Sequence, residues 1–194
     1  MTFRPAYDEI TLALGGNTVC LRPSLRAASY FARGNGLTTL HRRIAEFHLG
    51  TIRDLITKAA TDRQEAFAFL DQLDRTPLKA VADAIAASAL NLVAGFIPAP
   101  DDTGNPARTG KPVPWPDFYR DLYRTATGWL GWTAEAAWNA TPTEINNAIV
   151  GHIDYLKLTG VLVAGKDQKP TDPEQAARNV AKGLDPEFDR EGLR

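Results

Sequence analysis

The segment WPDFYRDLYRTATGWLGWTAEAAW, residues 115–138, contains all four tryptophans of the chain. Its apolar residues recur at the spacing of one helical face and predict a helix that loosens or ends near Gly131. Thr133 then has the position of an N-cap for a short second helix that carries Trp138. The residues of the first predicted face are Phe118, Leu122, Ala126, Trp129 and Leu130.

The run Thr141-Pro142-Thr143-Glu144 predicts the start of a third helix. It supplies a capping hydroxyl, a proline at the first helical position and a glutamate at the third, which together form a capping box. Three short helices therefore follow one another in this part of the chain. Their apolar residues continue with the row Ile145, Ile149, Ile153 and Leu156.

The four tryptophans have two interpretations, a small helical core or an aromatic docking surface. Trp and Tyr are frequent anchors at protein interfaces, and a unit this short cannot cover four indoles completely. We therefore expect both roles. Trp129 and Trp138 are assigned to the core. The predicted partner-binding residues are Trp115, Tyr119, Tyr123 and Trp132.

The N-terminal part of the chain predicts a β-hairpin followed by helices. Apolar residues alternate over residues 8–22 around Gly15-Gly16-Asn17, and the glycines permit the positive φ of a tight turn. Ser24 is a predicted cap for a helix over 25–33. Further helices are expected at 38–48, 51–60 and 62–75, and another starts at Thr76-Pro77.

Two details of these helices are specific enough to test. Thr61-x-x-Gln64 has the form of a capping box that opens the helix over 62–75. The residues expected to point inward from that helix are Ala66, Phe67, Leu70 and Leu73. In the next helix the predicted apolar stripe is Leu78, Val81, Ile85, Leu92, Val93 and Phe96.

The predicted fold class is mainly α with a small N-terminal β-hairpin, in two helical modules joined by a Pro/Gly-rich linker. Residues 1–96 form the first module, a hairpin plus a helical bundle. Residues 97–114 form the linker, because their prolines forbid a helix. Residues 115–165 form the tryptophan-rich module of three helices. Residues 166–194 are charged and poor in apolar side chains, so we expect a disordered tail there.

Composition limits the classes of function. Apolar residues make up 44% of the chain, charged residues 23%, and the net charge is −1, which is the balance of a globular protein without a strong overall field. The single Cys20 excludes an intrachain disulfide. No apolar run is long enough for a membrane span, and the first residues do not resemble a secretory signal. We expect the protein to act in the compartment where it is made, without a membrane partner.

No catalytic, metal or cofactor site is predicted, and we expect the protein not to be an enzyme. His41 and His48 stand two helical turns apart, so a structural role is favoured for the histidines. Residues 22–58 are locally basic, which suggests either a binding surface for nucleic acid or an acidic partner, or an ordinary helix surface whose charge is offset by acidic residues elsewhere. The ordinary helix surface is favoured, and the scarcity of aromatic residues there argues against binding of single strands. The basic residues are Arg22, Arg26, Arg33, Arg42, Arg43, Arg53 and Lys58.

Two segments resemble the tail assembly chaperones of gene transfer agents and long-tailed phages. In the first, Gly15-Gly16-Asn17 and the run from Arg22 to Ala28 resemble that family's N-terminal hairpin and its R-P-S-L-R-A-A helix start. The second resembles the family's tryptophan-rich module, with the pattern G-W-x-G-W-x-x-x-x-x-W-x-x-T-P-x-E. The matching residues are Gly128, Trp129, Gly131, Trp132, Trp138, Thr141, Pro142 and Glu144.

The resemblance implies a protein that binds the tape measure protein and helps to recruit tail tube subunits while a tail is assembled. Both modules lie in one chain, as in the longer form of such chaperones. The first would hold the tape measure and the second would engage the tube protein. The implied location is the host bacterial cytoplasm, with the protein absent from the mature virion.

Two alternatives remain at this stage. The protein could instead be a structural component of the mature tail or neck, or a nucleic-acid-binding regulator that uses residues 22–58. The sequence leaves open the oligomeric state and whether the two modules touch.

Overall fold

The computed structural model describes residues 9–34, 36–98, 113–161 and 181. The fold is mainly helical with one two-stranded antiparallel sheet, which confirms the predicted fold class. Residues up to His152 belong to one compact unit, and a second unit begins at Ile153. Most of the predicted linker and nearly all of the predicted tail lie outside the described residues.

The N-terminal hairpin has the predicted position. Strands β1 (Ile10–Leu14) and β2 (Asn17–Leu21) pair from Ile10 opposite Leu21 to Leu14 opposite Asn17. Gly15 and Gly16 form the two-residue turn with φ of +55° and +86°, the left-handed values that suit such a hairpin. One face is buried and packs on α4 and α5, through Leu12, Leu14, Val19 and Leu21.

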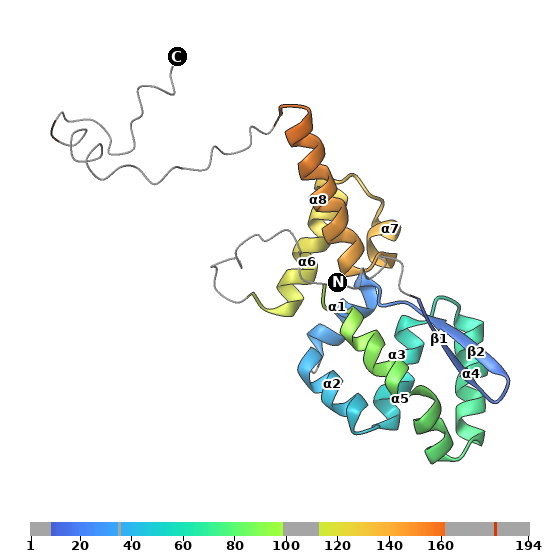
Figure 1. Ribbon diagram of the computed structural model, residues 1–194. Helices are drawn as coiled ribbons and strands as arrows, with labels where there is room; N and C mark the ends of the chain where they lie inside the picture. The colour runs from blue at the N-terminus through green and yellow to red at the C-terminus, as the bar shows by residue number, and fades with distance from the viewer. Residues whose placement is uncertain (1–8, 35, 99–112, 162–180, 182–194) are drawn as a thin grey trace. The chain divides into compact units, whose positions relative to one another are not determined.

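Five helices follow the hairpin (Figure 1). They are α1 (Leu25–Arg33), α2 (Leu37–Ala45), α3 (Leu49–Ala59), α4 (Arg63–Arg75) and α5 (Leu78–Gly95). Helix α1 begins where predicted, because the Ser24 hydroxyl accepts a hydrogen bond from the Ala27 amide. The predicted helix ranges agree with the observed ones to within a few residues.

The expected capping box at Thr61 is wrong. The cap of α4 is Asp62, whose carboxylate accepts the amide protons of Gln64 and Glu65. Thr61 instead donates its hydroxyl to the Cys20 carbonyl, and its amide bonds the same oxygen. Thr61 is therefore hydrogen-bonded to β2, and the neighbouring Asp62 caps the helix in its place.

Two residues expected to point inward are on the surface. Phe67 is 54% exposed and Leu78 is 58% exposed. In α4 the inward aromatic residue is Phe69, which is fully buried beside Leu70 and Leu73. Since 66, 69, 70 and 73 lie on one helical face, Phe67 falls outside it.

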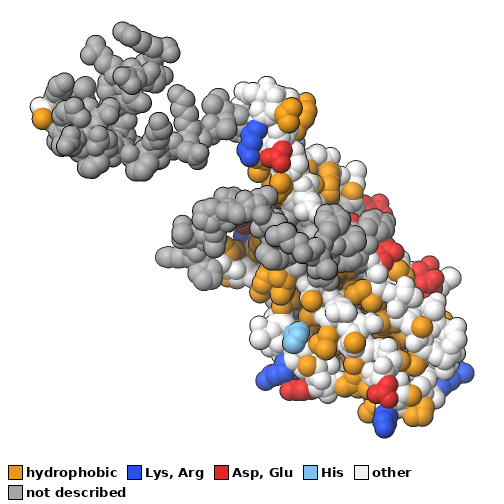
Figure 2. All heavy atoms as spheres, viewed as in Figure 1, with side chains coloured by type: hydrophobic (Ala, Val, Ile, Leu, Met, Phe, Trp, Pro, Cys, Tyr) orange, Lys and Arg blue, Asp and Glu red, His pale blue; other side chains and the backbone are white. Residues whose placement is uncertain are grey.

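Helix α5 is the long apolar helix of the first part of the chain. Among the described helices, it is the one that is long and apolar enough to span a membrane, with a mean hydropathy of 1.4. The core helix of a soluble protein can have the same length and composition. One of its rows is buried, and the opposite row is rich in alanine. Figure 2 shows hydrophobic side chains interspersed over α2 and α5, with charged side chains toward the edges of that face. The buried row is Val81, Ile85, Ala89, Leu92 and Val93.

The tryptophan-rich part contains α6 (Trp115–Arg124), a π-helical turn η1 (Thr125–Trp129), α7 (Ala134–Asn139) and α8 (Pro142–Leu158). The first helix loosens into the π turn before Gly131, where φ is +71°, as the glycines predict. Thr133 caps α7 by accepting from the Ala136 amide. Thr141 and Glu144 form the predicted capping box at α8, with reciprocal bonds of 2.7 and 3.1 Å.

Candidate functional site

The two segments that carry the family resemblance meet at a salt bridge. Arg22, just before α1, donates from Nη2 to both carboxylate oxygens of Glu144 at 2.7 and 2.8 Å. Each of the two side chains is only 15% exposed. Removing one member of such a pair leaves a partly buried charge without compensation. The arginine of one motif therefore holds the glutamate of the other in place.

Further hydrogen bonds complete this junction. Arg22 Nε donates to the Asn139 carbonyl at 2.8 Å, and the Leu25 amide donates to the Ala140 carbonyl at 2.7 Å. These carbonyls end α7, where helix geometry leaves acceptors without intrahelical donors. The Glu144 carboxylate also accepts the Thr141 amide. The T-P-x-E run thus caps α8 and docks it against the start of α1 with the same carboxylate.

The structure answers whether the two predicted modules touch. Helix α6 packs along α1, and one hydrophobic core includes buried residues from both parts of the chain. From the tryptophan-rich part the core takes Tyr119, Leu122, Ala126, Ala137, Ala140 and Ile145. Residues 9–98 and 113–152 therefore share one core.

Tyr119 is a core residue and offers no surface to a partner, which corrects its predicted role. Its side chain is fully buried, and its hydroxyl donates to the Phe96 carbonyl at 2.8 Å. Burial raises the pKa of the Tyr119 hydroxyl well above its usual value. This hydrogen bond ties α6 to the end of α5.

The other predicted partner-binding residues are half-buried. Trp115 stacks on Tyr119, with ring centroids 5.7 Å apart, and Tyr123 stacks on Trp138 at 4.5 Å. Trp115, Tyr123, Trp132 and Trp138 all pack against the core with part of each side chain exposed. Their predicted role in partner binding stays a prediction.

Trp129 is on the surface, which corrects its assignment to the core. Its side chain is 45% exposed, and its ring lies nearly perpendicular to that of His152, with centroids 4.9 Å apart. It lies at the end of the π turn, whose extra residue rotates the following side chains away from the face that α6 buries. The periodicity of an α-helix therefore mispredicts its direction.

A second surface lies on α3 and its neighbours, where two hollows flank Lys58. The first, of about 310 Å³, lies between α3 and α4 and is lined by Thr57, Lys58, Ala60, Arg63, Ala66 and Phe67. The second, of about 390 Å³, lies between α1, α2 and α3 and is lined by Tyr30, Phe31, Arg33, Gly34, Gly36, Leu40, Arg43, Thr51 and Asp54. We call the two hollows together the α3 groove.

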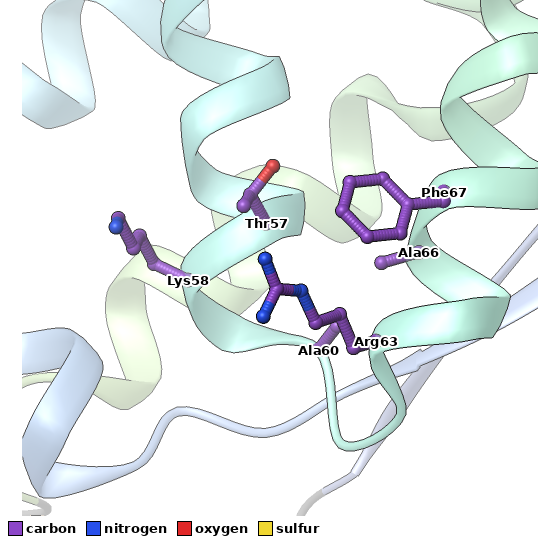
Figure 3. Close-up of a pocket in the computed structure, with 6 residues that line it drawn as sticks. All are labelled: Thr57, Lys58, Ala60, Arg63, Ala66 and Phe67. Atoms are coloured by element: carbon purple, nitrogen blue, oxygen red, sulfur yellow. The ribbon is translucent and has the colours of Figure 1, made fainter.

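Cations lie over both exposed aromatic rings of the α3 groove. Lys58 Nζ lies 4.6 Å from the centre of the Tyr30 ring, and the Arg63 guanidinium lies 5.4 Å from that of Phe67. Figure 3 shows Arg63 and Phe67 reaching from α4 toward Thr57 on α3, while Lys58 points to the other side. Lys58 therefore links the two hollows, because it lines one and covers the ring that lines the other.

No family model, curated protein or solved structure matches the chain.

His48, His152 and Cys20 each contact a neighbouring group, and His41 is exposed. His48 caps α3, since its Nδ1 accepts the Thr51 amide proton at 3.3 Å. Cys20 donates its thiol to Glu9 at 3.3 Å, and burial, followed by this hydrogen bond, raises the pKa of the Cys20 thiol. Within the described parts of the chain, no three His, Cys, Asp or Glu side chains come together to hold a metal ion.

Sequence reasoning missed the aromatic rings of the α3 groove. The helical pattern predicts that Phe67 points inward, and it gives no role to Tyr30. A usable pattern exists for one of them, because Arg63 and Phe67 stand four residues apart on a helix and so share a face. The Lys58–Tyr30 pair joins different helices and leaves no such pattern.

Proposed function

We propose that this protein is a tail assembly chaperone, an adaptor that binds the tape measure protein and helps to recruit tail tube subunits. It would act in the host bacterial cytoplasm and be absent from the finished particle. The proposal starts from the two motif-bearing segments described above, which resemble that family.

One observation carries the proposal furthest. Large aromatic side chains stand on the outside of a unit that already has a closed core: Tyr30 at 48% exposed, Phe67 at 54% and Trp129 at 45%. Exposed aromatic side chains are typical anchors for a protein partner. They lie in two places, the α3 groove and the end of η1, which suits an adaptor with two partners.

The ion pair between Arg22 and Glu144 joins the two segments that resemble the family motifs. An adaptor that holds one partner and recruits another benefits when its two binding surfaces are linked, because the second partner is then captured at a raised effective concentration. The mostly buried ion pair supplies that link within the compact unit.

Co-expression tests the proposal. The tape measure protein of the same genome is produced with and without this chain, and its soluble fraction is measured. We expect the tape measure to be soluble only in the presence of the chain. A tape measure that stays insoluble in its company would overturn the proposal, and so would stoichiometric amounts of the chain in purified particles by mass spectrometry.

A further inference from the structure

We infer that the α3 groove binds one amphipathic α-helix of a partner polypeptide, a helix with acidic side chains beside its apolar face. The inference rests on the proposed function and deepens it by naming a site and the chemistry of the partner. It follows from the charge and the apolar lining of the two hollows and from the residues of α3 that line both.

The charge of the α3 groove is strongly one-sided. Its lining residues include the cations Arg33, Arg43, Lys58 and Arg63, and one acid, Asp54. Among the described residues, none of these four cations forms an ion pair with a carboxylate. The protein as a whole has a net charge of −1. A local excess of unpaired cations on a nearly neutral protein favours an acidic partner.

The lining of the groove favours a polypeptide with apolar side chains. The first hollow contains the Phe67 ring and the methyl groups of Ala60 and Ala66. The second contains Tyr30, Phe31 and Leu40. Burying aliphatic side chains against such walls removes apolar surface from water, which favours the complex.

Helix α3 lines both hollows, which suits a partner helix that lies along it. Asp54 lines one hollow and Lys58 the other, and these residues stand one turn apart on α3, about 6 Å along the helix axis. A partner helix that lies along α3 presents apolar side chains at i, i+4 and i+7, spaced about 6 and 10 Å. Successive side chains would enter successive hollows, and acidic side chains beside them would meet Lys58 and Arg63.

The competing occupant is nucleic acid, which also seeks cations. Single strands bind by stacking their bases on open aromatic faces. Tyr30 and Phe67 each have one face already covered by a cation of this protein. A phosphate backbone also has no apolar groups that could fill the hollows. The geometry therefore favours the acidic helix.

Fluorescence anisotropy with a labelled synthetic probe tests the inference on the full chain. The probe is a designed amphipathic helix of three heptads with leucine on one face and glutamate beside it. The comparison probes carry lysine for glutamate, or the same residues in scrambled order, and a single-stranded and a double-stranded oligonucleotide complete the set. We expect binding of the acidic helix alone, weakened by added salt.

Two groove variants and two matched controls locate the binding. The double variant Lys58→Glu with Arg63→Glu is expected to weaken binding at least tenfold, and Phe67→Ala about fivefold. The charge control is Arg75→Glu, at the end of α4, with Lys79→Glu, in the first turn of α5. The control for the lost apolar side chain is Leu78→Ala, whose leucine is 58% exposed outside both hollows. Both controls should bind as the unchanged protein does, and thermal unfolding checks that all variants fold.

The outcomes separate this inference from the proposed function. Absence of acidic-helix binding, binding that the groove variants leave unchanged, or tighter binding of an oligonucleotide that the groove variants abolish would overturn the inference. If the double groove variant still keeps the tape measure soluble in co-expression, the chaperone function stands and the inference fails. If the acidic helix binds in the groove but the tape measure stays insoluble, the groove is real and the proposed function fails.

Discussion

The α3 groove and the tryptophan-rich residues 115–152 differ in how many aromatic side chains they contain and in how far those side chains are exposed. The tryptophan-rich part has more of them, but most pack on one another or on the core, as Tyr123 does on Trp138. The α3 groove has few, yet Tyr30 and Phe67 are about half exposed and each carries a cation over its ring. A high content of aromatic residues in a segment therefore indicates internal packing more than an exposed binding surface.

The same contrast holds for charge. Arg22 belongs to the basic stretch 22–58, but its side chain is mostly buried and bound to Glu144 and Glu9. Arg33, Arg43 and Lys58 belong to the same stretch and line an open groove. Only some members of a basic run can meet a partner, and the tertiary fold selects them.

The largest loss of stability is expected on replacement of Arg22. We expect Arg22→Ala to lower the free energy of unfolding by about 3 kcal/mol, because Glu144 would keep a largely buried carboxylate without its partner. Urea denaturation followed by circular dichroism measures the change. The matched control is Arg75→Ala, which removes an exposed i,i+4 pair with Asp71 and should cost less than about 0.5 kcal/mol. Equal effects of the two changes would show that the junction contributes no more than a surface ion pair.

Tyr119 offers the next largest effect. Tyr119→Phe should lower the free energy of unfolding by about 1–2 kcal/mol, because the Phe96 carbonyl loses a buried donor. Tyr123→Phe is the control, since the Tyr123 side chain is only half-buried. A loss no larger than that of the control would mean that Tyr119 does not join α6 to the first part of the chain.

Alkaline pH tests the same hydroxyl in a second way. The pKa of Tyr119 is raised by burial, so the folded state favours the neutral phenol. That contribution to stability is fully present below about pH 10, the usual tyrosine pKa, and is lost as the pH rises above it. The free energy of unfolding should therefore fall more steeply between pH 10 and pH 11 in the unchanged protein than in Tyr119→Phe. Parallel slopes would contradict the burial of this group.

Phe67 and Trp129 allow a direct comparison of the two regions, because both side chains are about half exposed. Each change to alanine should lower the free energy of unfolding by only about 1 kcal/mol, since much of each side chain already faces water. Their effects on binding should differ, because Phe67→Ala weakens the acidic helix probe and Trp129→Ala does not. Equal weakening by both changes would place the probe outside the α3 groove.

The smallest expected effect concerns Cys20. Burial and the hydrogen bond to Glu9 raise the pKa of its thiol, so little thiolate is present at pH 8. Iodoacetamide should alkylate Cys20 more slowly in the folded protein than in urea, and the rate should keep rising above pH 9. Mass spectrometry measures both rates. Equal rates in the folded and unfolded states would show that the thiol is open to solvent.

Much of the local structure is predictable from the residues. Gly15-Gly16 gives the hairpin turn, Ser24 and Thr133 give their helix caps, and Thr141 with Glu144 gives a capping box. Each depends on groups within a few positions of one another, so the sequence holds all the information. The failures begin where a distant group competes, as the Cys20 carbonyl does for Thr61.

The candidate site follows the same division. The basic character of residues 22–58 is visible in the sequence, and so is the Arg63–Phe67 spacing. The Lys58–Tyr30 contact and the two hollows depend on how α1, α2, α3 and α4 pack together. The direction of Trp129 depends on a π turn that α-helical periodicity does not anticipate.

The hairpin and the series of capped helices can be predicted from the sequence alone, because they follow from backbone preferences and from hydrogen bonds between near neighbours. The packing of distant segments, in contrast, makes Glu144 bind Arg22 as well as cap its own helix, and turns Tyr119 inward and Phe67 outward. The physical reason is that burial and ion pairing depend on groups far apart in the chain, whose approach no local pattern records.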